Sequence, residues 1–307
     1  MLERQGNQGY TDGDGPAAGC GAGECATVRH EAAVLAKGEP AGLLHAGGGD
    51  VGMMDREFYR LRAKLSVHKR RVDTAINNIK EALNIPGMWT VSCSGGKDSM
   101  ALLEICLLAG WRGPLFHFYY DETPGENTKM VKEAAQKYGL NLHVLKVPGA
   151  WDVYEKAGRF FVTPETSEEK RLVNEMLRGY KKAINKYVQE QGWIGQFMGL
   201  RKTESRARRI TLIKKGVIYK TADRYTWTCC PLSTWDATDV WAFVFERNLP
   251  YLSCYDKAED PEKERSEMTW LAAESIWRYG MAARLKKERP DEFNKLALRW
   301  PEIRRYI

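Results

Sequence analysis

The sequence lacks long apolar runs, a secretory signal and an even set of cysteines. Its longest apolar run, Met100 to Cys106, is interrupted by Glu104, whereas a transmembrane helix needs about 18 consecutive apolar residues. No apolar stretch follows a basic patch at the N-terminus, so it does not resemble a signal peptide. The seven cysteines are an odd number in a 307-residue chain, which argues against a disulfide framework. These absences exclude membrane and disulfide-scaffold proteins and predict a cytoplasmic protein with reduced thiols.

Residues 1–52 lack a hydrophobic period. They contain 13 of the 28 glycines and one aromatic residue, Tyr10, so we predict a disordered leader. A dinucleotide-type glycine pattern at 47–52 has no preceding strand, and Cys20 and Cys25 have no histidine partners, so neither is interpreted as a site. An alternative is that the leader is not translated and that the protein starts at residues 53–54.

Acidic residues are in deficit after the leader. The net charge is +7, and the seven acids and three bases of residues 1–52 leave +11 on residues 53–307. A cationic surface attracts polyanions. The charge therefore favours a polyanionic partner or acceptor, such as nucleic acid.

Hydrophobic periodicity predicts an α/β protein. Residues 55–83 are expected to form one long helix with a basic middle, and its apolar positions are Phe58, Leu61, Leu65, Val72, Ile76, Ile79 and Leu83. Strand and helix patterns then alternate. The expected strands are 89–93, 115–120, 142–147, 193–198 and 225–229, and the expected helices are 99–109, 127–138, 168–190, 237–247, 262–284 and 291–298. This order predicts a parallel sheet with helices on both faces.

The same patterns divide the chain into four parts. After the leader, residues 53–85 are predicted to form a basic helix and residues 86–256 an α/β domain. Residues 257–307 form a helical C-terminal extension. The sequence does not indicate the oligomeric state.

A glycine-rich segment, Ser94-Gly95-Gly96-Lys97-Asp98-Ser99, lies between the first expected strand and its helix. Adjacent glycines let the backbone approach an anion, and the loop N–H groups and the positive end of the helix bind it. We expect Lys97 to be an exposed loop lysine that adds a full charge, and Ser94 and Ser99 to add hydroxyl donors. Asp98 is predicted to cap the helix or to hold the Mg²⁺ of a polyphosphate.

The loop is not a Walker A motif, because Val91 stands where that motif needs glycine and Asp98 follows the lysine. It resembles the PP-loop of the adenine nucleotide α-hydrolase superfamily. Three later segments narrow the resemblance to the phosphoadenosine phosphosulfate (PAPS) reductase family and its ATP-sulfurylase small-subunit relatives. These segments are Tyr120-Asp121-Glu122-Thr123, Gly199 to Arg208, and the pattern from Pro231-Leu232 through Asp239-Val240-Trp241 to Tyr255-Asp256.

The resemblance covers roughly residues 86–256 and implies that they form a PP-loop nucleotide-binding domain. It also implies roles for individual residues. Lys97, Asp98 and Arg201 are expected to be catalytic, and Asp121, Arg201 and Arg208 to bind the nucleotide together with the loop residues Ser94, Gly95, Gly96, Lys97, Asp98 and Ser99. Asp98 is the expected Mg²⁺ ligand. Arg206 and Arg209 are expected on a solvated helix face, and Trp235, Trp241, Phe243 and Phe245 are assigned to packing.

The cysteines distinguish branches of the family. Iron–sulfur sulfonucleotide reductases carry a cysteine pair and a C-x-x-C motif, whereas this sequence has only the pair Cys229-Cys230, so no cluster is expected. The resemblance also implies a C-terminal Glu-Cys-Gly nucleophile in reductases. This sequence ends Arg-Trp-Pro-Glu-Ile-Arg-Arg-Tyr-Ile, and its last cysteine is Cys254.

The sequence therefore predicts an enzyme that uses ATP and Mg²⁺, cleaves ATP between the α and β phosphates and releases pyrophosphate. The acceptor is sulfate, a nucleic-acid base or another small molecule. One alternative is a thioredoxin-dependent reductase of PAPS or adenylyl sulfate. The other is a nucleotide- or nucleic-acid-binding module without turnover.

Overall fold

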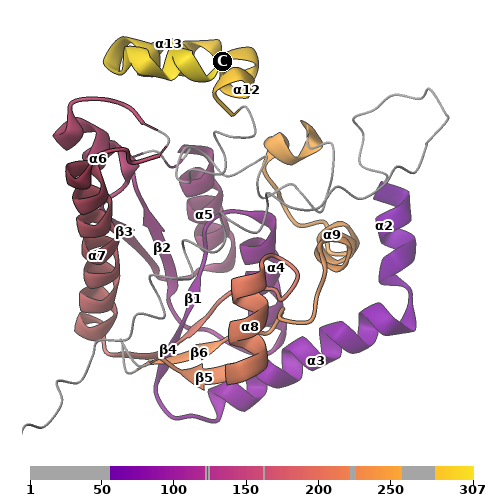
Figure 1. Cartoon of the computed structure of the whole chain (residues 1–307). Coiled ribbons are helices and arrows are strands. Elements are labelled where there is room, and N and C mark those ends of the chain that lie inside the picture. The colour runs from indigo at the N-terminus through magenta and orange to yellow at the C-terminus, as the bar shows by residue number, and fades with distance from the viewer. Residues whose placement is uncertain (1–55, 122, 124, 162, 222–225, 258–280) are drawn as a thin grey trace, which may run out of the picture. The chain divides into compact units, whose positions relative to one another are not determined.

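The computed structural model describes residues 56–121, 123, 125–161, 163–221, 226–257 and 281–307 (Figure 1). The predictions for the leader, and most of the helix expected at 262–284, lie outside these residues. Within them, no helix combines the length and apolar character needed to cross a membrane.

The single helix expected at 55–83 is wrong. The chain forms α2 (Arg56–Ala63) and α3 (Ser66–Leu83), because Leu65 adopts an extended backbone with ψ 139°. This break lets α2 pack on α9 (Ala237–Glu246) through Tyr59, whose ring lies 5.6 Å from that of Phe245. α3 instead packs into the main core through Ala75, Ile79 and Ala82.

The break also changes which side chains are buried. Phe58, Leu61 and Leu65, expected on the packed face, are 50%, 53% and 50% exposed, whereas Tyr59 and Ala63 are buried. The helical period over residues 55–83 was therefore correct for α3 and out of phase for α2.

The described residues contain a six-stranded sheet in the order β3-β2-β1-β4-β6-β5. Five strands pair in parallel: β1 (Met88–Ser92), β2 (Leu115–Tyr119), β3 (Leu142–Lys146), β4 (Trp193–Phe197) and β6 (Trp227–Cys229). The edge strand β5 (Ile218–Lys220), which the sequence did not indicate, runs antiparallel to β6. The strand order reverses between β1 and β4, and parallel α/β sheets bind ligands at the carboxyl ends of strands beside such a point.

Helices cover both faces of the sheet, which confirms the predicted fold class. α3, α4 (Lys97–Leu108), α5 (Gly125–Tyr138) and α9 contribute to the main core, and α7 (Ser167–Glu190) packs on the opposite face (Figure 1). Strand alternation separates the faces: Leu115 lies in the main core, and its neighbour Phe116 lies in the cluster against α7.

A further apolar cluster joins the segment between β3 and β4 to the C-terminal helices. It unites α6 (Ala150–Ala157) and the start of α7 with α12 (Met281–Glu288), α13 (Pro290–Arg299) and the 3-10 helix η2 (Pro301–Tyr306). Tyr154, Phe160 and Trp300 form its aromatic centre, with ring centroids 4.7–5.6 Å apart for the Tyr154 pairs. The C-terminal helices therefore share a core with the segment between β3 and β4.

Candidate functional site

The loop between β1 and α4 requires glycine at position 95. Gly95 has φ +80°, and a Cβ there would lie 2.5 Å from the carbonyl oxygen of Asn127. Asn127 also donates its side-chain amide to the Ser94 carbonyl oxygen at 3.0 Å. The first turn of α5 therefore packs directly on the loop and fixes its shape.

Gly96, and not Asp98, is the N-cap of α4, so the capping role predicted for Asp98 is wrong. The helix starts two residues earlier than the sequence indicated, which places Asp98 in its first turn. No side chain caps this end. Its amides instead face hydroxyl groups, since Gly96 N–H lies 3.4 Å from Ser94 Oγ and Lys97 N–H lies 3.4 Å from the Tyr255 hydroxyl.

Ser94 and Ser99 form a small hydroxyl cluster inside the loop. Ser99 Oγ donates to the Gly96 carbonyl at 2.8 Å and accepts from Ser94 N–H at 3.2 Å, and the two hydroxyl oxygens lie 3.2 Å apart. A phosphate oxygen would displace these hydroxyl oxygens from the loop N–H groups, because hydrogen bonds to an anion are stronger than hydrogen bonds to a neutral acceptor.

Lys97, Asp98 and Arg201 form a compact charged triad, and these are the three residues expected to be catalytic. Asp98 Oδ2 lies 2.6 Å from Lys97 Nζ, and Asp98 Oδ1 lies 2.5 Å from Arg201 Nε. Lys97 is 2% exposed and Arg201 is 5% exposed, so the expectation of an exposed loop lysine is wrong. The ends of β1 and β4, adjacent in the sheet, bring the three residues together.

The two cations determine the ionisation of Asp98. Burial opposes the charged carboxylate, but Lys97 and Arg201 outweigh it and hold the pKa of Asp98 below its usual range. Both carboxylate oxygens face these cations, so Asp98 acts as their counter-ion in this arrangement. The described residues hold no cluster of three or more His, Cys, Asp or Glu that would bind a metal ion. The Mg²⁺ role of Asp98 stays a prediction, and no step is derived through it.

Trp241 and Tyr255 enclose the side chain of Lys97. The sequence assigned Trp241 to packing and placed Tyr255 in the family pattern. Lys97 Nζ lies 5.9 Å from the ring centroids of both Trp241 and Tyr255, a distance at which a cation is attracted to a ring face. Tyr255 lies in η1 (Ser253–Lys257), and its hydroxyl would lie 3.1 Å from a Cβ at Gly96. The signal for this role was the Tyr255-Asp256 element of the family pattern.

A buried histidine under the loop was also missed. His117, on β2, is 1% exposed and bonds the Cys93 carbonyl through Nδ1 at 2.8 Å and Thr128 Oγ1 through Nε2 at 2.9 Å. Burial lowers the pKa of His117. A neutral histidine therefore links β1, β2 and α5 beneath the site.

Asp121 and Arg208, the other predicted nucleotide-binding residues, do not join the triad. Asp121 is largely exposed, pairs with Lys146 at 2.8 Å and lines a cavity of about 520 Å³ at the end of β2. Arg208 pairs with Glu204, whose carboxylate also accepts the Arg201 backbone N–H at 2.8 Å. Arg208 thus connects to the site through Glu204, and the nucleotide roles of both residues stay predictions.

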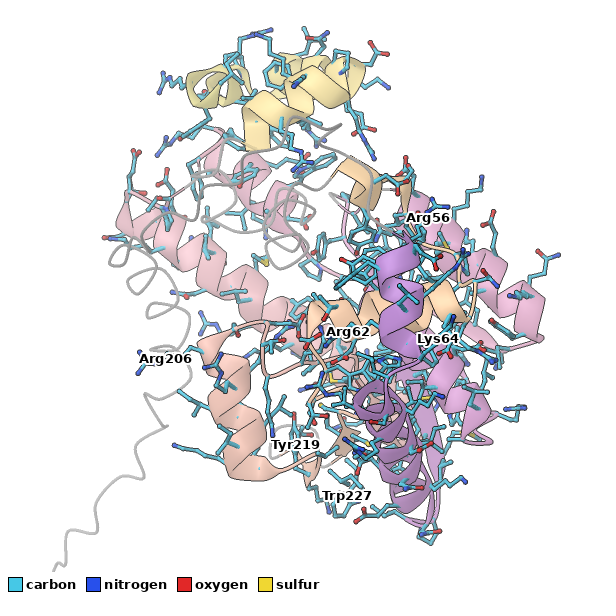
Figure 2. The ribbon with its side chains drawn as sticks, turned by 90° about the vertical axis from the view of Figure 1, so that its right-hand side faces the viewer. Arg56, Arg62, Lys64, Arg206, Tyr219 and Trp227 are labelled. Atoms are coloured by element: carbon cyan, nitrogen blue, oxygen red, sulfur yellow. The ribbon has the colours of Figure 1, made fainter. Side chains whose placement is uncertain are left out.

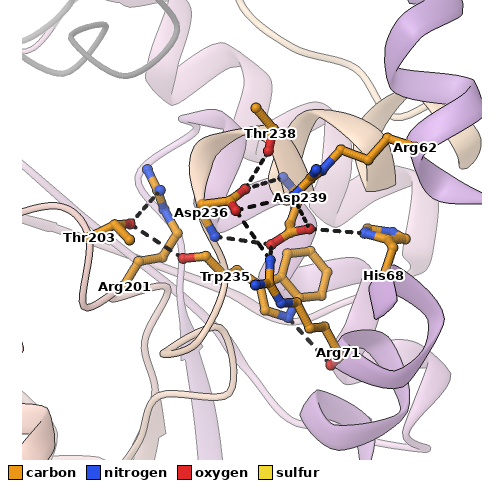
Figure 3. A network of polar contacts seen from close by, with 9 residues as sticks. All are labelled: Arg62, His68, Arg71, Arg201, Thr203, Trp235, Asp236, Thr238 and Asp239. Atoms are coloured by element: carbon orange, nitrogen blue, oxygen red, sulfur yellow. Dashed lines mark hydrogen bonds and ion pairs between the residues drawn. The ribbon is translucent and has the colours of Figure 1, made fainter. Parts of the chain in front are cut away.

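Arg201 is connected to the N-terminal helices by the polar network in Figure 3. Its Nη1 donates to Thr203 Oγ1 at 3.2 Å, which in turn donates to the Trp235 carbonyl at 3.3 Å. The adjacent Asp236 and the fully buried Asp239 pair with basic side chains of α2 and α3. These are Arg62, Arg71 and His68.

None of the cysteines in the described residues belongs to the charged triad, although Cys93 Sγ lies 3.7 Å from Ser99 Oγ in the loop. Cys229 and Cys230 are both fully buried, and burial raises the pKa of each, that of Cys230 to about 12. Cys93 and Cys106 are buried as well, and Cys254 is partly exposed. The packing assignment of Trp235, Trp241, Phe243 and Phe245 is confirmed, because all four are buried. Arg209 is exposed as expected, and Arg206 is at least partly exposed.

A parallel sheet with a glycine-rich loop between a strand and a helix, and two buried cations at adjacent strand ends, is typical of α/β proteins that bind phosphate groups. The chain belongs to the phosphoadenosine phosphosulfate reductase domain family, whose model matches residues 88–286. This confirms the resemblance that the motifs indicated and places the chain in a family of enzymes.

Two curated relatives carry the same name. The chain is 27% identical over 199 residues to sulfate adenylyltransferase subunit 2 of Shewanella amazonensis, an alignment that covers 56% of this chain and 61% of that protein. It is 26% identical over 221 residues to the subunit of the same name from Aeromonas hydrophila, covering 63% of this chain and 68% of that protein. The chain thus spans less than two thirds of the first relative.

Among solved structures, the chain is similar to a phosphoadenylyl-sulfate reductase from Candida auris in complex with phosphate, at 17% identity and a TM-score of 0.44 over 68% of this chain and 94% of that one. It is also similar to FMN adenylyltransferase from Candida glabrata in complex with ATP. The values are 18% identity and a TM-score of 0.41 over 62% of this chain and 60% of that one.

Proposed function

We propose that the chain binds ATP over residues 94–99 and transfers its adenylyl group to an acceptor with release of pyrophosphate. The observation that carries the proposal is the triad, in which the partly buried carboxylate of Asp98 holds two buried cations beside the start of α4. The triad has a net charge of +1, and the uncapped helix end adds partial positive charge. An arrangement of this kind favours a polyphosphate over a neutral ligand.

In the proposed reaction, an acceptor oxygen attacks the α-phosphorus of ATP. The bond from the α-phosphorus to the bridging oxygen breaks, the electron pair leaves with pyrophosphate, and any proton on the acceptor passes to water. Lys97 and Arg201 offset the charge that develops on the phosphate oxygens, and the N–H groups of the loop orient those oxygens. Because Asp98 already orders both cations, little reorganisation is needed when the nucleotide binds.

The relatives' name makes sulfate the first acceptor to test. Those proteins are named as subunit 2 of a sulfate adenylyltransferase, so a second subunit is a further proposed partner for this chain. A nucleic-acid base or another small molecule is the alternative acceptor. The positive charge of residues 53–307 favours a polyanionic acceptor such as nucleic acid.

Reduction of a sulfonucleotide is the competing function. It needs a reactive thiolate, and Cys254 is the partly exposed cysteine of the described residues. Burial raises the pKa of Cys254, which lowers its thiolate fraction at neutral pH. This observation favours adenylyl transfer over reduction.

Nucleotide binding tests the proposal without knowledge of the acceptor. ATP at 100 times its dissociation constant should stabilise the fold by about 2.7 kcal/mol, which corresponds to a rise in Tm of about 5–10 °C for a domain of this size. Lys97→Met keeps an unbranched side chain of nearly the same length and removes its charge, so this rise should disappear. Lys182→Met, an exposed lysine on α7, is the matched control and should keep it.

The products decide the bond that is cleaved. With sulfate as acceptor and [α-³²P]ATP, we expect the label in an adenylyl product and equal amounts of pyrophosphate. Lys97→Met should lower that rate about 10²–10³-fold, as loss of one transition-state charge partner does. Labelled ADP in place of an adenylyl product, or no thermal shift with ATP in the parent protein, would refute the proposal.

A further inference from the structure

One helix beside the site carries cations and no acids. From Ser205 to Thr221 the sequence contains no Asp or Glu. α8 (Arg206–Lys215) and β5 present five cations that are at least partly exposed, and together they form what we term the α8–β5 surface: Arg206, Arg209, Lys214, Lys215 and Lys220. None of the five forms an ion pair with a carboxylate in the part of the chain that the structure describes.

α7 differs from α8 in that it carries acids among its basic residues. On α7, Arg171 pairs with Glu168 and Glu175, and Lys186 pairs with Glu190, each about one helical turn away. α8 contains no acid of its own, and Arg208 pairs with Glu204, which lies before the helix begins. The other cations of α8 therefore create a local positive potential, which attracts polyanions.

α8 also contributes little to the core. Leu212 is the buried residue of the helix, whereas Ile210 is 42% exposed and Ile213 is 65% exposed. A helix with one buried side chain gains little from packing. The sequence of α8 is therefore better explained by what the helix presents to solvent than by what it buries.

The surface extends from the site to an aromatic residue, Tyr219, on the edge strand. α8 begins a few residues after Arg201, where Ser205 Oγ accepts the Arg208 N–H at 3.2 Å. Figure 2 shows Arg206 on α8 and Tyr219 on β5. Lys215 Nζ lies 5.3 Å from the centroid of the Tyr219 ring. Trp227 lies on the other face of the sheet, because Tyr219 is registered with its neighbour Thr228. Cations for phosphates and one partly exposed ring for a base thus lie on adjacent elements.

We propose that the α8–β5 surface binds a nucleic-acid strand. A ten-residue helix is about 15 Å long, which matches on the order of four phosphate spacings of 3.4 Å along one strand of a duplex. Partly exposed aromatic rings beside a basic groove are the features that stack bases in single-stranded binding proteins. A lipid surface is less suited, because interfacial helices bury Trp, Phe or Leu side chains along one face, and the large apolar side chains that α8 exposes are Ile210 and Ile213.

Binding is measured without ATP, so the result does not depend on the proposed adenylyl transfer. The probes are fluorescein-labelled single-stranded RNA and DNA of about 24 nucleotides, long enough to span the binding sites of about 4–16 nucleotides typical of such proteins. They are titrated by fluorescence anisotropy between about 50 and 200 mM KCl, the range over which phosphate contacts weaken steeply. The variant R206Q/R209Q/K214Q removes three cations of the surface. The control K170Q/K181Q/K182Q removes three cations of α7 and causes the same change in net charge.

The parent protein and the control should bind at least one of the two probes with affinities within about twofold of each other. The α8 variant should bind at least about tenfold more weakly, and its slope of log affinity against log salt should be smaller by about 2, at roughly 0.7 for each phosphate that the three cations neutralise in the parent. Its Tm and its thermal shift with ATP should match those of the parent, which separates this surface from the triad.

Three results would overturn the proposal. The first is no anisotropy change with either probe at the lowest salt and about 100 µM protein, a concentration at which even non-specific binding is expected. The second is an equal weakening in the α8 variant and the α7 control, which would show that only net charge matters. The third is binding to phosphatidylserine vesicles with no binding to either probe.

Discussion

Asp98→Asn tests the central feature of the site, because it removes the carboxylate that holds Lys97 and Arg201 together. The amide keeps the shape of the side chain but leaves two buried cations without their counter-ion. Removing one partner of a buried ion pair costs about 3–5 kcal/mol. The Asp98 side chain is 23% exposed, so solvent screens part of this cost. We expect a loss of about 2–3 kcal/mol, or about 5–10 °C in Tm.

The pH dependence of this loss has a defined sign. Because the pKa of Asp98 is lower in the folded protein than the value of about 3.9 in an unfolded chain, its stabilising contribution is complete above that value. The contribution falls as the pH drops through the folded pKa. The difference in unfolding free energy between parent and variant should therefore be constant from about pH 5 to 8 and shrink below about pH 4.

Urea denaturation at about pH 7 and about pH 3, above and below the onset of that change, measures both quantities. Asp121→Asn is the control, since it removes an exposed carboxylate paired with Lys146 and should cost less than about 1 kcal/mol. ATP should stabilise Asp98→Asn more than the parent, because phosphate oxygens replace the missing counter-ion. A variant that melts within about 1 °C of the parent at neutral pH would refute the role of Asp98 assigned above.

Three further predictions concern the loop and the thiols. Gly95→Ala should cost about 1–3 kcal/mol more than Gly139→Ala in urea denaturation, because both have positive φ but only Gly95 of the two lies against backbone, at Asn127; equal costs would contradict the close approach. Cys229 and Cys230 should resist iodoacetamide at mildly alkaline pH in the native protein and react after unfolding, since burial raises the pKa of both; rapid native labelling detected by mass spectrometry would show that they are accessible. With PAPS and reduced thioredoxin the protein should release no sulfite above background, and thioredoxin-dependent sulfite that disappears in Cys254→Ser would instead establish reduction.

Local patterns were sufficient to predict much of the fold. The strands expected at 89–93 and 115–120 and the helix at 168–190 lie within about two residues of their observed bounds, because each has a clear hydrophobic pattern. β5 has only three residues, too few for a period, and was missed. The break at Leu65 arises because α2 packs on α9, which lies far away in the sequence and gives no local signal.

The site shows the same division. The composition of residues 94–99 identified the loop, and the family pattern selected Arg201, which the structure brings to Asp98. The burial of Lys97 was not predictable from its neighbours, because Trp241 and Tyr255 enclose it from far later in the chain. His117 was missed for a related reason, since its partners at Cys93 and Thr128 lie on other elements.

The pairing of β1 with β4 has a consequence for how the chain folds. Met88 is registered with Trp193, so the two strands that precede Lys97 and Arg201 are far apart in the sequence. Closing a loop of that length costs entropy before any native contact repays it, and such non-local pairings form slowly. During synthesis, the loop at residues 94–99 emerges long before its arginine does. A ligand that needs both cations therefore cannot speed up the early steps of folding. It stabilises the chain only after β4 has joined the sheet.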